Sequence, residues 1–277
     1  MGPAPMASAM HMAVHPETVY AHSAVVLAGF IIGIAVLGAV IIETCTRSFI
    51  STASRRAHTD VAAAMLGTIG TTYAVLLALV ATVAWEGYNH AAVATQDEVT
   101  AIASVLLATD GLDAHDAAPV RAGLIAYTRG VIEDEWPAQA AGMLPALVSP
   151  VITRINLLCA DLQPATAAAT NIQSRLLSAV TRLAEARSMR LHLAGVTLPG
   201  IVWTTLLFGG LLTICAGSFV AAPSLRSHLV MSSVLALSGA MVLVLIVALS
   251  SPFRGAFALS SAPYAEVLAA LTPPPRG

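Results

Sequence analysis

The stretch TTYAVLLALVATVAWEGYNHA, Thr71–Ala91, decides how this chain of 277 residues is interpreted. Apart from its hydroxyl groups it is apolar as far as Ala84, and it then continues as WEGYNH without a turn signal. A helix on the surface of a soluble core carries a polar stripe with a period of about 3.6 residues, and this stretch has none. Aromatic residues gather where the hydrocarbon of a bilayer meets water. Trp85 and Tyr88 therefore predict the end of a membrane span, with Glu86 just outside the hydrocarbon.

The composition agrees with a protein that is solvated by lipid. Of its residues 57% are hydrophobic and 10% are charged, and the mean hydropathy is +0.81. A soluble domain carries about 25% charged residues, so this chain could not cover a water-exposed surface. All 13 basic residues are Arg, and a net charge of −2 gives no reason to expect a nucleic-acid partner. Membrane lipids are the expected surroundings.

Four windows are long and apolar enough to cross a membrane, which takes about 20 residues. They are Ser23–Ile42, Ala62–Trp85, Leu198–Ala221 and Leu229–Ser250. None has Asp, Glu or Arg in its interior, and each is apolar all round, which predicts an all-α integral membrane protein with four transmembrane helices. Proton-coupled carriers and voltage sensors need charged groups deep in the membrane. The absence of such groups from the four spans argues against both classes.

These spans divide the chain into five segments. An N-terminal tail (1–22) precedes the first two spans (23–85), a helical extramembrane domain (86–196) and the last two spans (197–250), and a C-terminal tail (251–277) follows. The apolar run after residue 22 is too long for a cleaved signal sequence, so it is expected to be retained.

The arginines predict the orientation. Arg47, Arg55 and Arg56 lie between the first two spans, and Arg226 lies between the last two. Short loops rich in Arg face the cytoplasm, although Arg254, just past the fourth span, opposes this assignment. We therefore expect a multi-pass protein of the cell's inner (plasma) membrane, with both termini and residues 86–196 outside the cytoplasm.

The segment 86–196 is predicted to form a helical bundle that stands on the membrane. Val99, Ile102, Val105 and Leu106 repeat at helical spacing and continue the second span beyond the bilayer. A break is expected near Gly111 and Asp113. A second apolar stripe lies on a long helix that leads toward the third span, at Ile172, Leu176, Val180 and Leu183.

Between these two helices, Asp116-Ala-Ala-Pro119 resembles a helix start, with the proline in the first turn. This helix is expected to end before Trp136-Pro137. Three carboxylates, Glu133-Asp134-Glu135, would then oppose the dipole at its C-terminus and need basic partners. The candidates are Arg175, Arg182, Arg187 and Arg190. A salt-bridged structural site is favoured over a divalent-cation site or a catalytic pair.

Hydroxyl groups mark one broad face of the second span, at Thr68, Thr71, Thr72 and Thr82. They either bond back to the carbonyl four residues earlier, which is the favoured interpretation, or form the polar lining of a conducting path. Small residues at Gly29 and Gly33, and at Gly209, Gly210 and Gly217, predict close helix packing, within one subunit or between subunits. The segment Ser251–Gly255 is expected to end the fourth span, with Phe253 at the interface and Arg254 reaching lipid headgroups.

Neither an enzyme nor a cofactor is expected. The sequence has no HExxH, no GxSxG, no Walker loop and no GxGxxG after a strand. Its three cysteines are scattered, which suggests small buried residues and no metal knuckle. The N-terminal tail has soft donors at Met6, Met10, His11, Met12, His15 and His22. A flexible tail with chance enrichment is favoured there over a copper site.

Four stretches in order resemble the bacterial bestrophin-like family, also described as a domain of unknown function, over about residues 25–270. They are YAVLLALVATVAWEGYNHA with the following DEVTAIASVL, Tyr127 with EWP, LPGIVWTTLLFGG, and PFRGAFALSSAPY. The residues that carry this resemblance are Tyr73, Trp85, Glu86, Tyr88, Asn89, Glu135, Trp136, Pro137, Pro199, Trp203, Pro252, Phe253 and Gly255.

Bestrophins are pentameric anion channels whose second transmembrane helix lines the pore neck, so the resemblance implies a homo-oligomeric ion channel. The lining candidates are then Thr68, Thr71, Thr72, Leu76, Val80, Thr82 and Val83. Anions are favoured by the resemblance and by the arginines of the helix before the third span. Bestrophins keep the segment between spans two and three in the cytoplasm, whereas the arginines here place it outside. The alternative function is a non-conducting membrane scaffold or sensor whose helical domain binds a partner.

Overall fold

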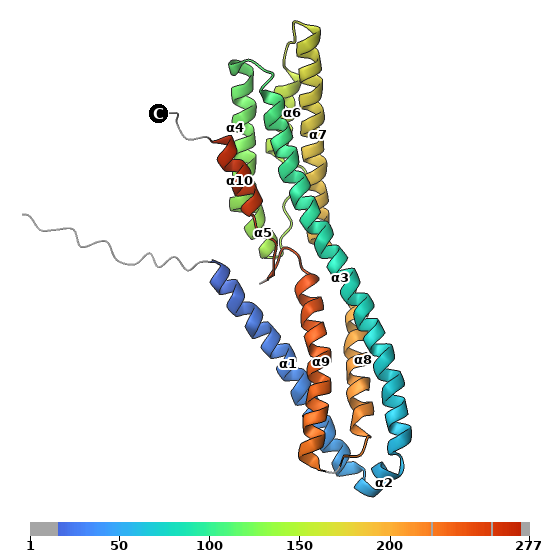
Figure 1. The fold of residues 1–277 in the computed structure, drawn as a ribbon. Coiled ribbons are helices and arrows are strands. Elements are labelled where there is room, and N and C mark those ends of the chain that lie inside the picture. Colours follow the sequence, from blue (N-terminus) through green and yellow to red (C-terminus); the bar gives the residue numbers. More distant parts are fainter. Residues whose placement is uncertain (1–15, 223, 256, 273–277) are drawn as a thin grey trace, which may run out of the picture.

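The computed structural model describes residues 16–222, 224–255 and 257–272, and within these ranges it is helical without strands. The helices form one elongated bundle (Figure 1). Their bounds are α1 Pro16–Phe49, α2 Thr52–Ala57, α3 Thr59–Thr109, α4 Ala114–Gly130, the π-helical segment η1 Val131–Glu135, α5 Trp136–Ala140, α6 Pro150–Ala160, α7 Ala167–Gly195, α8 Gly200–Ser218, α9 Leu225–Leu249 and α10 Ala262–Leu271.

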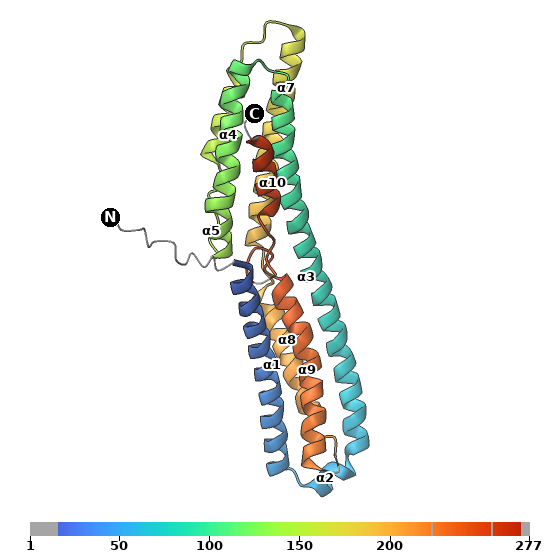
Figure 2. The same cartoon turned by 60° about the vertical axis from the view of Figure 1, so that its left-hand side comes forward.

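One half of the bundle contains the spans. The helices α1, α8, α9 and the first half of α3 run side by side there, with α2 across one end (Figures 1 and 2). Four segments are long and apolar enough to cross a membrane, namely Val25–Phe49, Thr59–Thr109, Ala167–Ser218 and Leu225–Leu249. They include the predicted windows almost completely. The prediction of four membrane helices in an all-α fold is confirmed.

The other half is the predicted helical bundle. α3 continues into it without a break, and α4, α6, α7 and α10 pack around this continuation (Figure 1). Its buried core joins five helices through Ile102, Val105, Leu124, Ile155, Leu176, Val180, Leu183 and Tyr264. The two predicted apolar stripes, on α3 and on α7, therefore meet in this core. α7 ends at Gly195, and Pro199 then caps the start of α8.

Two predicted helix boundaries were wrong. α4 begins at Ala114, because the side chain of Asp113 accepts a hydrogen bond from the Asp116 amide, and Pro119 consequently lies inside the helix. The chain also stays helical through Pro137 instead of stopping before it. A proline ring clashes with the carbonyl four residues earlier, and the wider π turn of η1 directly precedes it, so the helix continues to Ala140.

Close packing between α3 and α8 holds the membrane half together. Tyr73 of α3 is buried among Leu77, Leu206 and Ile246. Its ring lies against two glycines of α8, where a Cβ atom on Gly209 would come within 2.6 Å of Tyr73 Cδ2. This pair of glycines therefore packs within one subunit. A Cβ atom on Gly29 or Gly33 of α1 would meet nothing within 4 Å, so that face has no packing partner among the described residues of the protomer.

We expect Gly209→Ala to destabilise the protein by about 1–3 kcal/mol, because the added methyl group overpacks the contact with Tyr73. The free energy of unfolding in detergent micelles would measure this effect. Gly200→Ala is the matched control on the same helix, since its Cβ atom would meet nothing within 4 Å. Equal stability of the two variants would show that Tyr73 does not require a glycine there.

Candidate functional site

The face of α3 that points away from α8 and α9 is the first candidate. In the protomer α3 lies along one edge of the membrane half (Figure 1), and one helical stripe of its side chains is exposed. This α3 outer face comprises Thr68, Thr71, Thr72, Val75, Leu79, Thr82, Val83 and Glu86. It continues above the span through His90, Val93 and Asp97, which are also exposed.

The threonines of this face bond back to their own helix. The hydroxyl of Thr68 donates to the Ala64 carbonyl at 3.2 Å, that of Thr72 to the Thr68 carbonyl at 2.9 Å, and that of Thr82 to the Ala78 carbonyl at 2.9 Å. The favoured interpretation of these three hydroxyls is confirmed. Since each hydroxyl oxygen keeps free lone pairs after donating, the face still offers weak acceptors to whatever lies against it.

The remaining residues predicted on this helix are distributed over its other sides. Leu76 and Val80 are half-buried and pack against the membrane core, so they point toward the protomer. Trp85 is exposed, and its ring stacks on that of Tyr88 at a centroid distance of 6.4 Å. Asn89 is half-buried. The aromatic pair thus lies beside Glu86 at the predicted end of the span.

A second set of motif residues surrounds Arg190 of α7, which is fully buried. Its Nε lies 2.7 Å from Glu98 Oε2, and its Nη2 lies 2.6 Å from Glu135 Oε2. Arg187 binds the other oxygen of Glu135 at 2.6 Å, and the hydroxyl of Tyr127 donates to Glu98 Oε1 at 2.7 Å. We call these residues the Arg190 cluster.

The prediction that Glu135 has basic partners on α7 is confirmed for Arg187 and Arg190. Arg175 and Arg182 form no ion pair within the described part of the chain, and Glu133 instead faces Arg129 at 3.9 Å on the surface. Burial, together with the negative charge of Glu98, raises the pKa of Tyr127 well above its ordinary value. The phenol therefore stays protonated and continues to donate to Glu98 at any physiological pH.

Aromatic rings cover the Arg190 cluster. The ring of Trp136 contacts Phe253 edge-on at 5.5 Å and Tyr264 at 5.5 Å, and the guanidinium of Arg190 lies 5.8 Å from the Trp136 ring. The indole of Trp136 also donates to the Leu259 carbonyl. Phe253 was expected at the membrane interface but is buried at 3% exposure, because the chain after α9 continues into the extramembrane domain and places this ring against Trp136.

The segment after α9 leads the chain from the membrane half into the extramembrane domain (Figure 1). In this segment Pro252 is buried, and Gly255 has a φ of 81° that favours glycine. Trp203 of α8 packs against the membrane core. Arg254 donates to the Gly142 carbonyl at 3.4 Å, so it contacts the extramembrane domain where lipid headgroups were expected. Pro137 is exposed. The Arg190 cluster and its aromatic cover consequently fasten the C-terminal segment to the domain.

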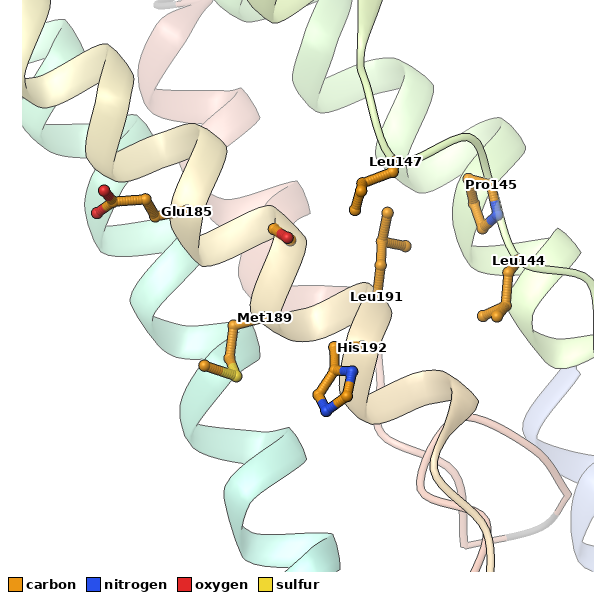
Figure 3. Close-up of a pocket in the computed structure, with 8 residues that line it drawn as sticks. Leu144, Pro145, Leu147, Glu185, Met189, Leu191 and His192 are labelled. Carbon is orange, nitrogen blue, oxygen red and sulfur yellow. The ribbon is translucent and has the colours of Figure 1, made fainter.

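A shallow groove opens beside the membrane-proximal end of α7. Figure 3 shows Leu144, Pro145 and Leu147 of the α5–α6 loop on one side, and Met189 and His192 of α7 on the other. Its volume is about 600 Å³. The lining is mainly apolar, and the Leu147 and Met189 side chains are exposed at 67% and 54%.

The possible metal ligands and the cysteines are scattered over the described residues. No group of three or more His, Cys, Asp and Glu side chains that could hold a metal ion occurs among the described residues. The side chains of the N-terminal Met and His set lie outside the described residues. Of the cysteines, Cys159 is buried, and burial raises the pKa of its thiol to about 11, whereas Cys45 is exposed and Cys215 half-buried. The expectation of three buried cysteines was therefore correct for Cys159 alone.

One charged cluster was missed by the sequence analysis. Glu43 of α1, Arg55 of α2 and His228 of α9 are buried together where these helices meet. The predicted spans ended at Ile42 and began at Leu229, so each boundary excluded an ionisable residue by one position. Glu43 and His228 both lie on span helices, directly beyond predicted windows that contain no Asp, Glu or Arg.

Together the fold and these clusters define a four-span helical membrane protein whose extramembrane bundle is built on its second span. The bestrophin-like domain model matches residues 32–264. The chain therefore belongs to the bestrophin-like family.

Solved structures share this fold. One mutant form of a bacterial bestrophin homologue from Klebsiella pneumoniae has a TM-score of 0.64 at 13% identity, and the alignment covers 88% of this chain and 98% of that one. A second mutant form has a TM-score of 0.65 at 14% identity, with 88% and 97% covered. No curated protein matches the sequence.

We expect Arg190→Met to destabilise the folded protein by about 3–5 kcal/mol, because it leaves Glu98 charged and buried without its main partner. Arg121→Met is the matched control, since Arg121 and Asp110 form an exposed pair that contributes about 1 kcal/mol or less. Unfolding in detergent micelles would measure both. A loss no larger than that of the control would show that the buried pair adds nothing to stability.

Proposed function

We propose that the protein forms a homo-oligomeric ion channel in which the α3 outer face surrounds the pore. The observation that carries this proposal is the contrast between this face and the outer faces of the other spans. α1, α8 and α9 present large apolar side chains that suit lipid, among them Phe30, Leu37, Leu207, Phe208, Val234 and Met241. The α3 outer face presents four threonines on one stripe with Val75, Leu79 and Val83, and it leads directly to Glu86.

A ring of such faces would give a narrow path with an apolar middle. Val75, Leu79 and Val83 are each more than half exposed and lie on one stripe with the threonines. Apolar constrictions of this kind close by losing water, and hydroxyl oxygens ease the passage of hydrated ions. Leu76 and Val80 would then support the wall from inside the protomer, while Thr68, Thr71, Thr72, Thr82 and Val83 would line it.

The charges near the path bear on the permeant ion. The resemblance favours anions, but Arg187 and Arg190 are neutralised by Glu135 and Glu98, so they add little positive potential. α3 itself contains no Arg. Its outer face carries Glu86, and the continuation of this face above the span carries Asp97. Anion permeation therefore rests on the family resemblance, whereas the charge at this mouth of the path favours cations.

We expect the purified oligomer to conduct ions in planar bilayers. Glu86→Gln should move the reversal potential in a KCl gradient toward the chloride equilibrium potential, because a ring of carboxylates would be lost. Glu266→Gln on α10 is the matched control, since this exposed carboxylate lies outside the α3 outer face. Silence of an intact oligomer across salts, pH and voltage would exclude a channel, and an unchanged reversal potential in Glu86→Gln would exclude this face as the lining.

The orientation is part of the proposal. α2, with Arg55 and Arg56, and the first turn of α9, with Arg226, lie at the same end of the bundle (Figure 1). The positive-inside rule places this end in the cytoplasm. Residues 86–196, together with α10, would then lie outside the plasma membrane.

An engineered cysteine would test this orientation. Ala114→Cys, at the exposed start of α4, should react with a membrane-impermeant maleimide on intact cells when the native cysteines have been replaced by alanine. Arg56→Cys on α2 should react only after permeabilisation. The reverse pattern would place the helical domain in the cytoplasm.

The second candidate function is a non-conducting scaffold or sensor. The groove between the α5–α6 loop and α7 favours it, because exposed Leu147 and Met189 suit an apolar partner. A silent oligomer in bilayers would leave this function as the better supported of the two.

A further inference from the structure

A buried cluster at the end of the membrane half that carries α2 contains a histidine between a carboxylate and a guanidinium. Glu43, Arg55 and His228 have side chains that are at most 4% exposed. We call this end, where α1 ends, α2 crosses and α9 begins, the foot of the bundle. Arg55 Nη2 lies 3.1 Å from Glu43 Oε1, 3.2 Å from the Val220 carbonyl and 2.7 Å from His228 Nδ1. Arg55 thus ties α2 to α1, to the α8–α9 turn and to α9.

The position of His228 Nδ1 imposes a choice. It lies 2.7 Å from Arg55 Nη2 and also 2.8 Å from Glu43 Oε1. A guanidinium only donates hydrogen bonds and a carboxylate only accepts them. Without a proton, Nδ1 can accept from Arg55, and with a proton it can donate to Glu43, but it cannot do both. The two protonation states of this ring therefore require different partners.

The other groups around the ring favour the unprotonated Nδ1. On α1, Arg47 Nε lies 3.0 Å from the same Glu43 oxygen. On α8, the Gly217 carbonyl lies 3.3 Å from His228 Nε2. The Thr59 hydroxyl of α3 donates to the Arg55 carbonyl and adds no charge to the cluster. The cluster already has two guanidinium groups and one carboxylate. A charged imidazole would add a further positive charge to a site that is closed to water.

We propose that His228 is a proton-binding site that acts as an acid-sensitive latch of the foot. In the closed foot the neutral ring accepts from Arg55 through Nδ1 and donates Nε2–H to the Gly217 carbonyl. Proton uptake at Nδ1 removes the acceptor of Arg55 and makes Nδ1 a donor to Glu43 Oε1, which already lies 2.8 Å away. Arg55 is displaced, and the α8–α9 turn loses its contact through the Val220 carbonyl.

Two buried polar atoms that have no hydrogen-bond partner among the described residues support a second arrangement. They are Glu43 Oε2 and Arg55 Nε, and both belong to the cluster itself. Buried polar atoms usually have partners, and each one left without a partner costs free energy. They give the cluster spare capacity to re-pair after the ring has taken up a proton. This proposal does not depend on whether the protein conducts ions.

Hydrogen–deuterium exchange on the full-length protein in lipid nanodiscs tests the latch. The readout is the protection of backbone amides in residues 217–228, corrected for intrinsic exchange, at pH 5.5 and pH 7.5. We expect protection to be lower at pH 5.5, by at most about tenfold for each pH unit, which is the limit for uptake of one proton. His228→Gln keeps a donor and an acceptor but cannot titrate, so its protection should not differ between the two pH values.

His58→Gln is the matched control, because this histidine is exposed at the junction of α2 and α3 and should leave the pH response unchanged. Glu43→Gln should lower protection at both pH values, and it tests the cluster if His228→Gln does not fold. The proposal is overturned if acid increases protection of this segment in the wild type, or if His228→Gln retains the wild-type pH response.

Discussion

The continuity of α3 is the constraint on which the rest of the structure depends. A helix of 51 residues is about 75 Å long, whereas the hydrocarbon of a bilayer is only about 30 Å thick. The same helix therefore serves both as a span and as the central helix of the extramembrane domain. Any side chain that α3 presents near the bilayer is positioned rigidly by the packing of its other half. This rigidity explains how one exposed stripe can run from Thr68 to Asp97.

The Arg190 cluster makes this coupling specific. Apolar stripes alone would let α7 slide or rotate against α3, because many registers bury a similar area. The bond from Arg190 to Glu98 sets one register between these two helices, and its second bond to Glu135 adds the η1 segment. Burying such ions costs desolvation free energy, so their contribution lies more in selecting one arrangement than in net stability, which is a hypothesis for this protein. Trp136 and Phe253 complete the site by excluding water from it.

Much of this architecture could be predicted from the sequence, because spans and apolar stripes are local, periodic patterns. The four spans, the continuation of α3 and the partners of Glu135 on α7 were all accessible in this way. Glu98 was missed because its pairing with Arg190 depends on the packing of two distant helices. A signal existed, since Glu98 occupies the stripe that Ile102 and Val105 continue, where a charged residue must find a buried partner.

The cluster at the foot was missed for a different reason. Boundaries inferred from hydropathy are uncertain by a few residues, and here Glu43 and His228 fell just outside the predicted spans. The charged groups at the foot therefore escaped notice, while the interior was correctly recognised as apolar. Between these ends the spans are held by packing alone, as between Tyr73 and Gly209. Because apolar contacts are not directional, the polar clusters at the two ends are what fixes the spans relative to one another.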